Sequence, residues 1–387
     1  MTVLMEKRDL GIVSLSITNK FGAAHEKSEI KGIAHVIEHL LFTGTKTRTH
    51  EDISKEIEKK GGILNAFTSH EITSYWFKLP SEHIFAGLDI LCDMLNNPKF
   101  EKEKFEKEKK VILEEIKMYH DDPKRAVFEQ IEKNLFEKPF GELVIGNSKT
   151  VSSLNRDFVA DYFDNMYNPE NYIVTIVGNA DFNEICDYLE RKFQKKGRKM
   201  GGFNIKRRNG ESIEERDGID QAHFIFAMHA PLPSEKDSFD LEVLDAYLAN
   251  GMSSRVFLEI REKRGLAYAV TSSIDCEKSY SFYTIYVGTM KDKVGEVKRL
   301  ILEEFDNVKN MKEKDLEQAK ERVIGLKKVV SEESINVMNQ LVFSELSGKA
   351  EDYYEHEEKI REVKLENVKK LASKLIKEYS SAAIVPK

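Results

Sequence analysis

The sequence has 387 residues, of which 41% are hydrophobic and 33% are charged, and its formal net charge is −7 at pH 7. A single hydrophobic core stops growing at about 250–300 residues, so this length predicts two domains. The negative charge and the interleaving of lysine with glutamate argue against a nucleic-acid-binding protein. The three widely spaced cysteines predict free thiols. No apolar run reaches the ~18 residues of a membrane helix and no signal-peptide pattern stands at the amino end, so we expect a cytoplasmic protein without a membrane partner.

Strand and helix patterns alternate along the first half and recur in a similar order along the second. In the first half we predict strands at 2–5, 11–18, 64–78 and 172–177 and helices at 33–42, 51–60, 81–96, 101–119, 125–136 and 183–193. In the second half we predict strands at 221–229, 267–274, 280–288 and 382–385 and helices at 239–249, 293–308, 313–331 and 335–347. The polar, glycine-containing stretch 197–218 is typical of a linker. The pattern therefore predicts a duplicated α/β domain, with an amino-terminal domain at 1–196 and a carboxy-terminal domain at 219–387.

The predicted helix at 33–42 carries His35, Glu38 and His39 in an otherwise apolar run. Residues four apart lie on one face of a helix, so the two imidazoles are placed one above the other. Burial of an unpaired carboxylate is unfavourable, and a cation between the imidazoles would remove that difficulty for Glu38. Two neutral imidazoles, one carboxylate and an open position are a typical ligand set of catalytic zinc. The segment reads His-x-x-Glu-His, which is the inverzincin signature, so we predict a zinc site here.

A third protein ligand is expected from the predicted helix at 101–119. Glu108 and Glu115 are seven residues apart, so they lie on or beside the single apolar stripe of this helix. Glu114 has lysines at i−4 and i+3 and belongs to the solvated face. Helical phase therefore favours Glu115 over Glu114 as a ligand. The alternative interpretation is an ordinary surface helix with glutamate–lysine pairs.

On these residues the chain resembles the pitrilysin/insulinase (inverzincin) family of zinc peptidases, which includes the mitochondrial processing peptidase. In that family the third ligand is a glutamate 76 residues after the second histidine, which is the position of Glu115. The resemblance implies that Glu108 supports the site without binding metal and that Glu38 is the general base toward a water on the zinc. The corresponding stretch of the second half, 244–248, has no ligand set, so we expect one Zn²⁺ per chain.

The stretch 61–75 is similar to the family's Gly-Gly-x-x-Asn-Ala-x-Thr-x-x-Glu-x-Thr-x-Tyr strand. The resemblance implies that Asn65, Ala66 and Phe67 lie on an exposed edge strand, to which the substrate peptide adds through backbone hydrogen bonds. The alternative is an edge strand with no binding role.

A second resemblance involves Arg261 and Tyr268, which are seven residues apart, as in the arginine–tyrosine segment of the family. The resemblance implies that this pair contacts the peptide backbone and helps to stabilise the tetrahedral intermediate. Arg255 and Arg264 are rival candidates for the arginine, and each has the alternative role of a surface charge.

The resemblance covers nearly the whole chain and implies an α+β fold with two duplicated domains, each a mixed, largely antiparallel sheet packed with helices. Larger members hold four such domains in a closed clamshell, so we expect a homodimer that hydrolyses short or unfolded peptides in a chamber. The alternatives are a non-catalytic scaffold and one subunit of a heterodimeric peptidase. The chain departs from the family pattern at its start, because Met1 falls where a lead-in ending in Asn-Gly would finish. We therefore expect a slightly truncated or short amino end.

Overall fold

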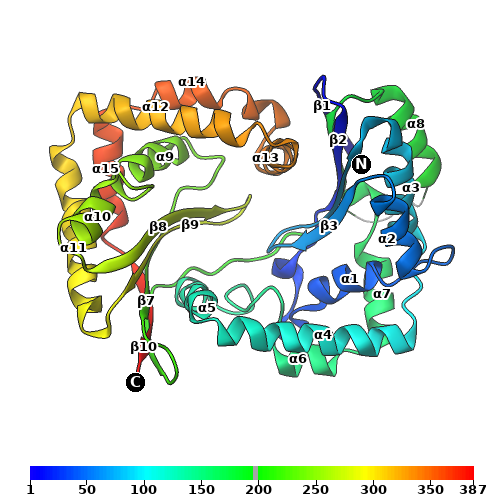
Figure 1. Ribbon diagram of the computed structural model, residues 1–387, viewed down its shortest axis with the longest axis horizontal. Helices are drawn as coiled ribbons and strands as arrows, with labels where there is room; N and C mark the ends of the chain where they lie inside the picture. The colour runs from blue at the N-terminus through cyan, green and yellow to red at the C-terminus, as the bar shows by residue number, and fades with distance from the viewer. Residues whose placement is uncertain (195–198) are drawn as a thin grey trace. The chain divides into compact units, whose positions relative to one another are not determined.

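The computed structural model describes residues 1–194 and 199–387, which form two compact units (Figure 1). Each unit contains one five-stranded mixed sheet packed with helices, so the predicted fold class is confirmed. Neither unit is continuous in sequence. Unit 1 consists of Met1–Lys117, Glu142–Asn204 and Ser331–Glu345, and unit 2 of Met118–Gly141, Ile205–Val330 and Leu346–Lys387.

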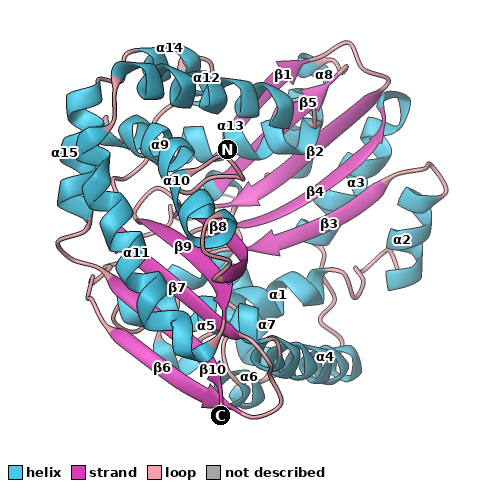
Figure 2. Ribbon diagram, turned by 60° about the vertical axis from the view of Figure 1, so that its left-hand side comes forward, coloured by secondary structure: helices cyan, strands magenta, loops and turns pink. Residues whose placement is uncertain are grey.

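The sheet of unit 1 has the strand order β1-β5-β2-β4-β3. Its members are β1 (Thr2–Lys7), β5 (Tyr172–Gly178), β2 (Ile12–Asn19), β4 (Thr73–Pro80) and β3 (Ile63–Thr68). β1 pairs in parallel with β5, and the other pairs are antiparallel. β3 therefore lies at one edge of the sheet, beside β4 (Figure 2).

The stretch 64–78, predicted as one strand, is a hairpin of β3 and β4. The chain turns between Thr68 and Thr73, where the backbone N–H of Ser69 donates to the carbonyl of Ile72 at 2.8 Å. The Ser69 hydroxyl donates to the same carbonyl. Local side-chain bonds of this kind favour a turn over a continued strand. The prediction of a single strand was therefore wrong.

Along β2, apolar and hydroxyl-bearing side chains alternate between the two faces of the sheet, and both faces are buried. Leu15 and Ile17 face an apolar core shared with α1 (Ile33–Leu41), α3 (Ile84–Asn96) and α8 (Phe182–Lys192). The alternate residues Ser14, Ser16 and Thr18 are also fully buried. The Ser14 hydroxyl is hydrogen-bonded to that of Ser334, the first residue of α13 (Ser334–Ser347). The helices of unit 1 are α1 (Ile33–Leu41), α2 (His50–Glu58), α3 (Ile84–Asn96), most of α4 (Lys102–Asp121), α6 (Ser148–Ser153), α7 (Arg156–Met166), α8 (Phe182–Lys192) and nearly all of α13 (Ser334–Ser347). Of these, α6 and α7 were not predicted.

The sheet of unit 2 repeats this connectivity in the order β6-β10-β7-β9-β8. Its members are β6 (Glu211–Arg216), β10 (Ser380–Pro386), β7 (Ala222–His229), β9 (Ser281–Thr289) and β8 (Ala267–Cys276). The strands that come first and last in the sequence, β6 and β10, pair in parallel, as β1 and β5 do in unit 1. The remaining pairs are antiparallel. This repetition agrees with a duplicated domain.

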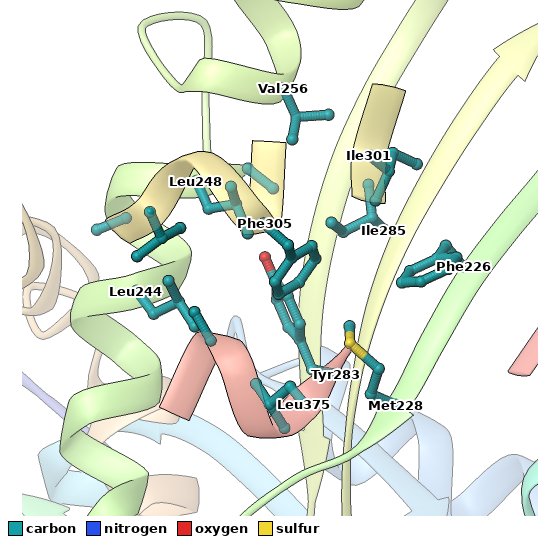
Figure 3. Close-up of a cluster of buried hydrophobic side chains, with 14 of the residues drawn as sticks. Phe226, Met228, Leu244, Leu248, Val256, Tyr283, Ile285, Ile301, Phe305 and Leu375 are labelled. Atoms are coloured by element: carbon teal, nitrogen blue, oxygen red, sulfur yellow. The ribbon is translucent and has the colours of Figure 1, made fainter. Parts of the chain in front are cut away.

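One face of this second sheet packs on an apolar core (Figure 3). Phe226 and Met228 of β7 and Tyr283 of β9 meet Phe305 and Leu375 from two helices. The helices of unit 2 are α5 (Pro123–Leu135), α9 (Asp237–Leu248), α10 (Arg255–Phe257), α11 (Val294–Asn307), α12 (Glu313–Val330), α14 (His356–Arg361) and α15 (Leu365–Leu375).

Each unit includes a helix from the other half of the sequence. α5 begins at Pro123 because the Asp122 carboxylate caps its first turn and proline needs no N–H partner at that position. The buried Asn134 amide of α5 donates to the Ser212 hydroxyl of β6 at 2.8 Å and to the Ser381 carbonyl of β10 at 3.0 Å. α13 plays the reciprocal part in unit 1.

The predicted boundary between 196 and 197 lies outside the described residues. Of the predicted linker 197–218, the part from Glu211 to Arg216 forms β6, because its backbone pairs with β10. The division into domains at 1–196 and 219–387 stays a prediction. Within the described residues, no helix is both long and apolar enough to cross a membrane.

Candidate metal centre and active site

The helix α1 places the imidazoles of His35 and His39 side by side, with ring centroids 4.7 Å apart. The Nε2 atoms of His35 and His39 lie 3.7 Å and 3.6 Å from the same oxygen, Oε2 of Glu115. His35 is buried, and His39 and Glu115 are half-buried. Three potential ligand atoms therefore converge from two helices, α1 and α4, which lie next to each other in Figure 1.

Glu115 and its neighbour Glu114 differ as helical phase predicts. Glu115 faces the histidines. Glu114 instead pairs with Lys117 at 2.7 Å, and its side chain is 72% exposed. Ile112, on the same side of α4 as Glu115, is fully buried. The geometry therefore brings Glu115, and not Glu114, to the two imidazoles.

Glu108 makes contact with the other nitrogen of a histidine. Its Oε2 lies 3.3 Å from Nδ1 of His39. A carboxylate in this position fixes the tautomer and orientation of an imidazole whose Nε2 is a ligand. The Nδ1 of His35 is buried and has no hydrogen-bond partner among the described residues.

The electrostatics differ between the two histidines. Burial, helped by the nearby His39, lowers the pKa of His35 to about 4, so this imidazole is neutral at pH 7. Burial also lowers the pKa of His39, but the carboxylates of Glu108 and Glu115 outweigh burial and raise it to about 9. The negative charge around His39 thus attracts a cation, which is a proton in the metal-free protein.

Glu38 points to the strand β3. The Thr68 hydroxyl donates a 2.5 Å hydrogen bond to Oε2 of Glu38. Burial raises the pKa of Glu38, although this hydrogen bond and the neighbouring His39 oppose the increase. Thr68 belongs to the predicted substrate strand, but its contact with Glu38 was not predicted. The two-residue periodicity, which puts Thr68 on the same side of the sheet as Ala66, is the one sequence signal that indicates it.

The donor set fits zinc. Ligands at ~2.0–2.1 Å from a tetrahedral Zn²⁺ lie about 3.3 Å from one another. The two nitrogen–oxygen distances of 3.6 and 3.7 Å are close to that separation. The part of the chain that the structure describes contains one group of three or more histidine, cysteine, aspartate or glutamate side chains placed to hold a metal ion. That group is His35, His39 and Glu115.

Comparison with known proteins identifies the family of this chain. The model of the insulinase family, peptidase family M16, matches residues 2–147, and the model of the peptidase M16 inactive domain matches residues 153–323. An uncharacterized zinc protease of Bacillus subtilis, YmxG, is 33% identical over 386 residues, which cover 97% of this chain and 93% of that protein. The chain belongs to the insulinase (M16) peptidase family. The predicted family resemblance is therefore confirmed.

Solved structures with low sequence identity share the M16 fold. A protease from Helicobacter pylori matches with a TM-score of 0.89 at 19% identity, over 99% of this chain and 96% of that chain. A chain of complex III2 from Candida albicans matches with a TM-score of 0.86 at 15% identity, over 99% and 93%. These likenesses concern the fold alone. The M16 family and the zinc-protease names of the relatives support a peptidase.

The stretch that we predicted to bind substrate forms β3. Asn65 is exposed, Ala66 and Phe67 are half-buried, and the Asn65 side-chain oxygen accepts a hydrogen bond from the Ala66 backbone. Among the described strands β3 pairs with β4 alone, so its other edge is open to a further strand.

The predicted arginine–tyrosine pair, Arg261 and Tyr268, lies in unit 2. Arg261 is in a π-helical turn (Leu258–Glu262), and Tyr268 sits at a bulge near the start of β8, 76% exposed. Arg255 pairs with Glu304 at 2.6 Å, and Arg264 pairs with Glu259 at 2.7 Å. Among the described residues, the contacts of the Arg261 guanidinium are longer, 5.0 Å to the Phe257 ring and 3.8 Å to Glu262. Its guanidinium is thus less engaged than those of its two rivals.

In unit 2, Asp245 lies in the stretch 244–248, which we predicted to correspond to the histidine segment of the first half. It accepts hydrogen bonds from Ser272 at 2.5 Å and Tyr283 at 2.7 Å. Its carboxylate is thus satisfied by hydroxyl groups.

Proposed function

We propose that this protein is a zinc-dependent endopeptidase that hydrolyses short or unfolded peptides. The observation that carries the proposal is the convergence of His35 Nε2, His39 Nε2 and the Glu115 carboxylate beside the acidic Glu38. Membership of the M16 family and the zinc-protease names of the relatives support it.

In this proposal His35, His39 and Glu115 hold one Zn²⁺ per chain. When bound, the ion would supply Lewis-acid chemistry, for the scissile carbonyl and for a water that is acidic near neutral pH. Glu108 keeps the His39 ring oriented through Nδ1, so that Nε2 faces the ligand position.

Glu38 is the proposed general base. Its carboxylate takes a proton from the attacking water and passes that proton to the leaving amine as the carbon–nitrogen bond breaks. Thr68 holds one oxygen of Glu38, which leaves the other oxygen to receive the proton. Burial raises the pKa of Glu38 and so strengthens it as a base.

The open edge of β3 is the proposed binding site for the peptide backbone, at Asn65, Ala66 and Phe67. Backbone hydrogen bonds of this kind hold many sequences equally well. Arg261 and Tyr268 are proposed to contact the peptide and to stabilise the negative oxygen of the tetrahedral intermediate. The exposure of Tyr268 and the long contacts of Arg261 leave both groups available for this role.

We further propose a homodimer that forms a closed chamber. The resemblance implies four α/β domains in a complete chamber, and this chain holds two. The zinc motif and the arginine–tyrosine segment stand in the same chain, so two identical copies provide both. In this arrangement Arg261 and Tyr268 of one copy serve the metal site of the other copy.

The test combines zinc analysis, gel filtration and cleavage of a quenched fluorescent peptide by the purified chain. We expect about one zinc per chain, a dimer, and cleavage that stops on chelation and returns with zinc. A metal-loaded dimer that cleaves none of a varied peptide set would contradict the peptidase and favour a scaffold. A zinc-loaded monomer that becomes active only with a second M16 protein would favour a heterodimer.

A further inference from the structure

The helix α1 begins without a side-chain cap of its own. Its first flanking residue is Gly32, with a φ of 98° that favours glycine. The Glu26 carboxylate takes the place of a cap, since Oε2 accepts the N–H of Gly32 at 2.9 Å and Oε1 accepts the N–H of Ala34 at 2.7 Å. Two bonds from one rigid group fix both the position and the rotation of the first turn, and a negative charge is favourable at this end of a helix.

Lys31 completes this buried group. The side chains of Glu26 and Lys31 are both fully buried, and Nζ of Lys31 lies 3.8 Å from Oε2 of Glu26. The same ammonium donates to the carbonyl of Ala23 at 2.7 Å. A buried charge is tolerated only when it is paired and hydrogen-bonded, and each member of this pair provides that for the other.

The segment before α1 is also attached to the substrate hairpin. The N–H of Ala23 donates to the carbonyl of Ser69 at 3.0 Å, and the N–H of Ala24 donates to that of His70 at 2.6 Å. These two acceptors directly follow Thr68, the hydrogen-bond donor to Glu38. One short segment therefore connects the start of α1 with the end of β3.

The far end of α1 is tied to α4. Lys104 donates from α4 to the carbonyl of Thr43, just beyond α1, at 2.7 Å. The same helix α4 carries Glu108 and Glu115. With Glu26 at its start and Lys104 beyond its end, α1 is held relative to every other element that contributes to the metal centre.

We infer that Glu26 and Lys31 are positioning residues, which place α1 so that His35 and His39 meet Glu115 and Glu38 meets Thr68. The inference rests on the proposed zinc site. A displacement of the first turn would move His35 directly, because His35 follows the hydrogen-bonded Ala34. Metal and catalytic groups tolerate displacements of only about 0.5 Å, so loss of this attachment has a measurable effect on the metal.

The test uses the full chain loaded with Co²⁺, whose visible absorption reports ligand geometry, together with zinc affinity from competition with a chelator. Glu26→Gln keeps the side-chain shape but turns one acceptor into an N–H donor facing a backbone N–H. We expect an altered cobalt spectrum, a zinc affinity about tenfold weaker, and a kcat that falls more than KM changes. Glu26→Gln alone leaves the buried Lys31 ammonium without its ion-pair partner, which lowers thermal stability. The double variant Glu26→Gln/Lys31→Met removes both charges, so we expect it to regain thermal stability but not the wild-type cobalt spectrum.

Asp93→Asn is the matched control. Asp93 is also a buried carboxylate of unit 1, and it accepts hydrogen bonds from Thr45, Thr47 and Arg48. We expect this variant to lose thermal stability and keep the wild-type cobalt spectrum. If Glu26→Gln does not fold, Glu26→Asp takes its place in the test. The shorter carboxylate keeps the ion pair with Lys31 but cannot reach the N–H groups of both Gly32 and Ala34.

A wild-type cobalt spectrum and zinc affinity in a folded Glu26 variant would overturn the inference. The cobalt spectrum and the zinc affinity need no peptide, so these two readouts separate this inference from the proposed activity. A wild-type chain that binds cobalt but cleaves nothing contradicts the peptidase alone.

Discussion

Glu38 and Glu115 are neighbouring carboxylates with different proposed tasks, and substitution separates them. Glu38→Gln removes the proton acceptor but none of the three proposed ligands. We expect zinc content to stay near wild type while kcat falls by about 10²–10⁴-fold. Zinc analysis and peptide cleavage on the same preparation check this. Turnover at the wild-type rate would remove Glu38 from the role of base.

Glu115 and Glu114 form a matched pair for the ligand assignment. Glu115→Gln replaces the oxygen that both imidazoles face, so we expect zinc occupancy to fall by about tenfold or more under chelator competition. Glu114→Gln affects only an exposed ion pair with Lys117 and should leave occupancy unchanged. The opposite pattern would contradict the assignment.

Asp240 in unit 2 gives a pH prediction away from the metal. Burial, reinforced by Asp237, raises its pKa to about 6 from 3.8. The folded state therefore binds the proton more tightly, and the free energy of unfolding contributed by this group falls as pH rises from about 4 to 6. Asp240→Asn should remove that fall and add about 1–2 kcal/mol to the free energy of unfolding at pH 7. Urea unfolding at pH 4 and pH 7 tests this, with the exposed Asp220→Asn as a control that should show no difference.

At the residue scale, the sequence was sufficient to predict that the proposed metal ligands lie close together. His35 and His39 were predicted from their spacing on one helix, and Glu115 from helical phase together with the spacing that the family resemblance implies. The structure brings their ligand atoms within 4.8 Å of one another. Thr68 and Glu26 were not predicted. Their contacts depend on how a strand and a loop lie against α1, and neither periodicity nor composition encodes that placement.

Among the elements, the exchanged helix α5 gives the clearest prediction. Asn134→Ala leaves the Ser381 carbonyl and the Ser212 hydroxyl without this buried donor. We expect the free energy of unfolding to fall by about 2–3 kcal/mol. Lys133→Ala, on the exposed side of the same helix, should change it by less than about 0.5 kcal/mol. Equal effects in urea unfolding would show that the Asn134 contacts do not hold α5.

Long periodic helices such as α4 and α12 were predicted within a few residues. The hairpin of β3 and β4 was predicted as one strand because its turn contains residues that also occur in strands. The strand β6 was interpreted as linker because five of its six residues are polar, with Ile213 as the one apolar side chain. It is an edge strand, and its pairing with β10 depends on residues about 170 positions away in the chain.

For the whole molecule, mixing two inactive variants tests the proposed dimer. If each site takes Glu38 from one copy and Tyr268 from the other, a mixed dimer of Glu38→Gln and Tyr268→Phe chains has one intact site. Random exchange then restores about a quarter of the wild-type sites. Peptide cleavage before and after mixing measures the recovery. Activity no higher than that of the separate variants would contradict sharing between copies.

The duplication was predicted from the repeated order of elements, and the two sheets have the same connectivity. The exchange of α5 and α13 was not predicted. An amphipathic helix shows in its sequence that one face is buried, but not which sheet buries it.

The exchange of α13 sets a time order for synthesis. Unit 1 includes residues up to Glu345 of the 387-residue chain. A ribosome must therefore translate as far as Glu345 before the last segment of unit 1 exists, and until Ser334 has been added the Ser14 hydroxyl of β2 lacks this partner. The unit that carries the proposed metal ligands is therefore completed only after α13 has been synthesised, long after those ligands themselves have left the ribosome.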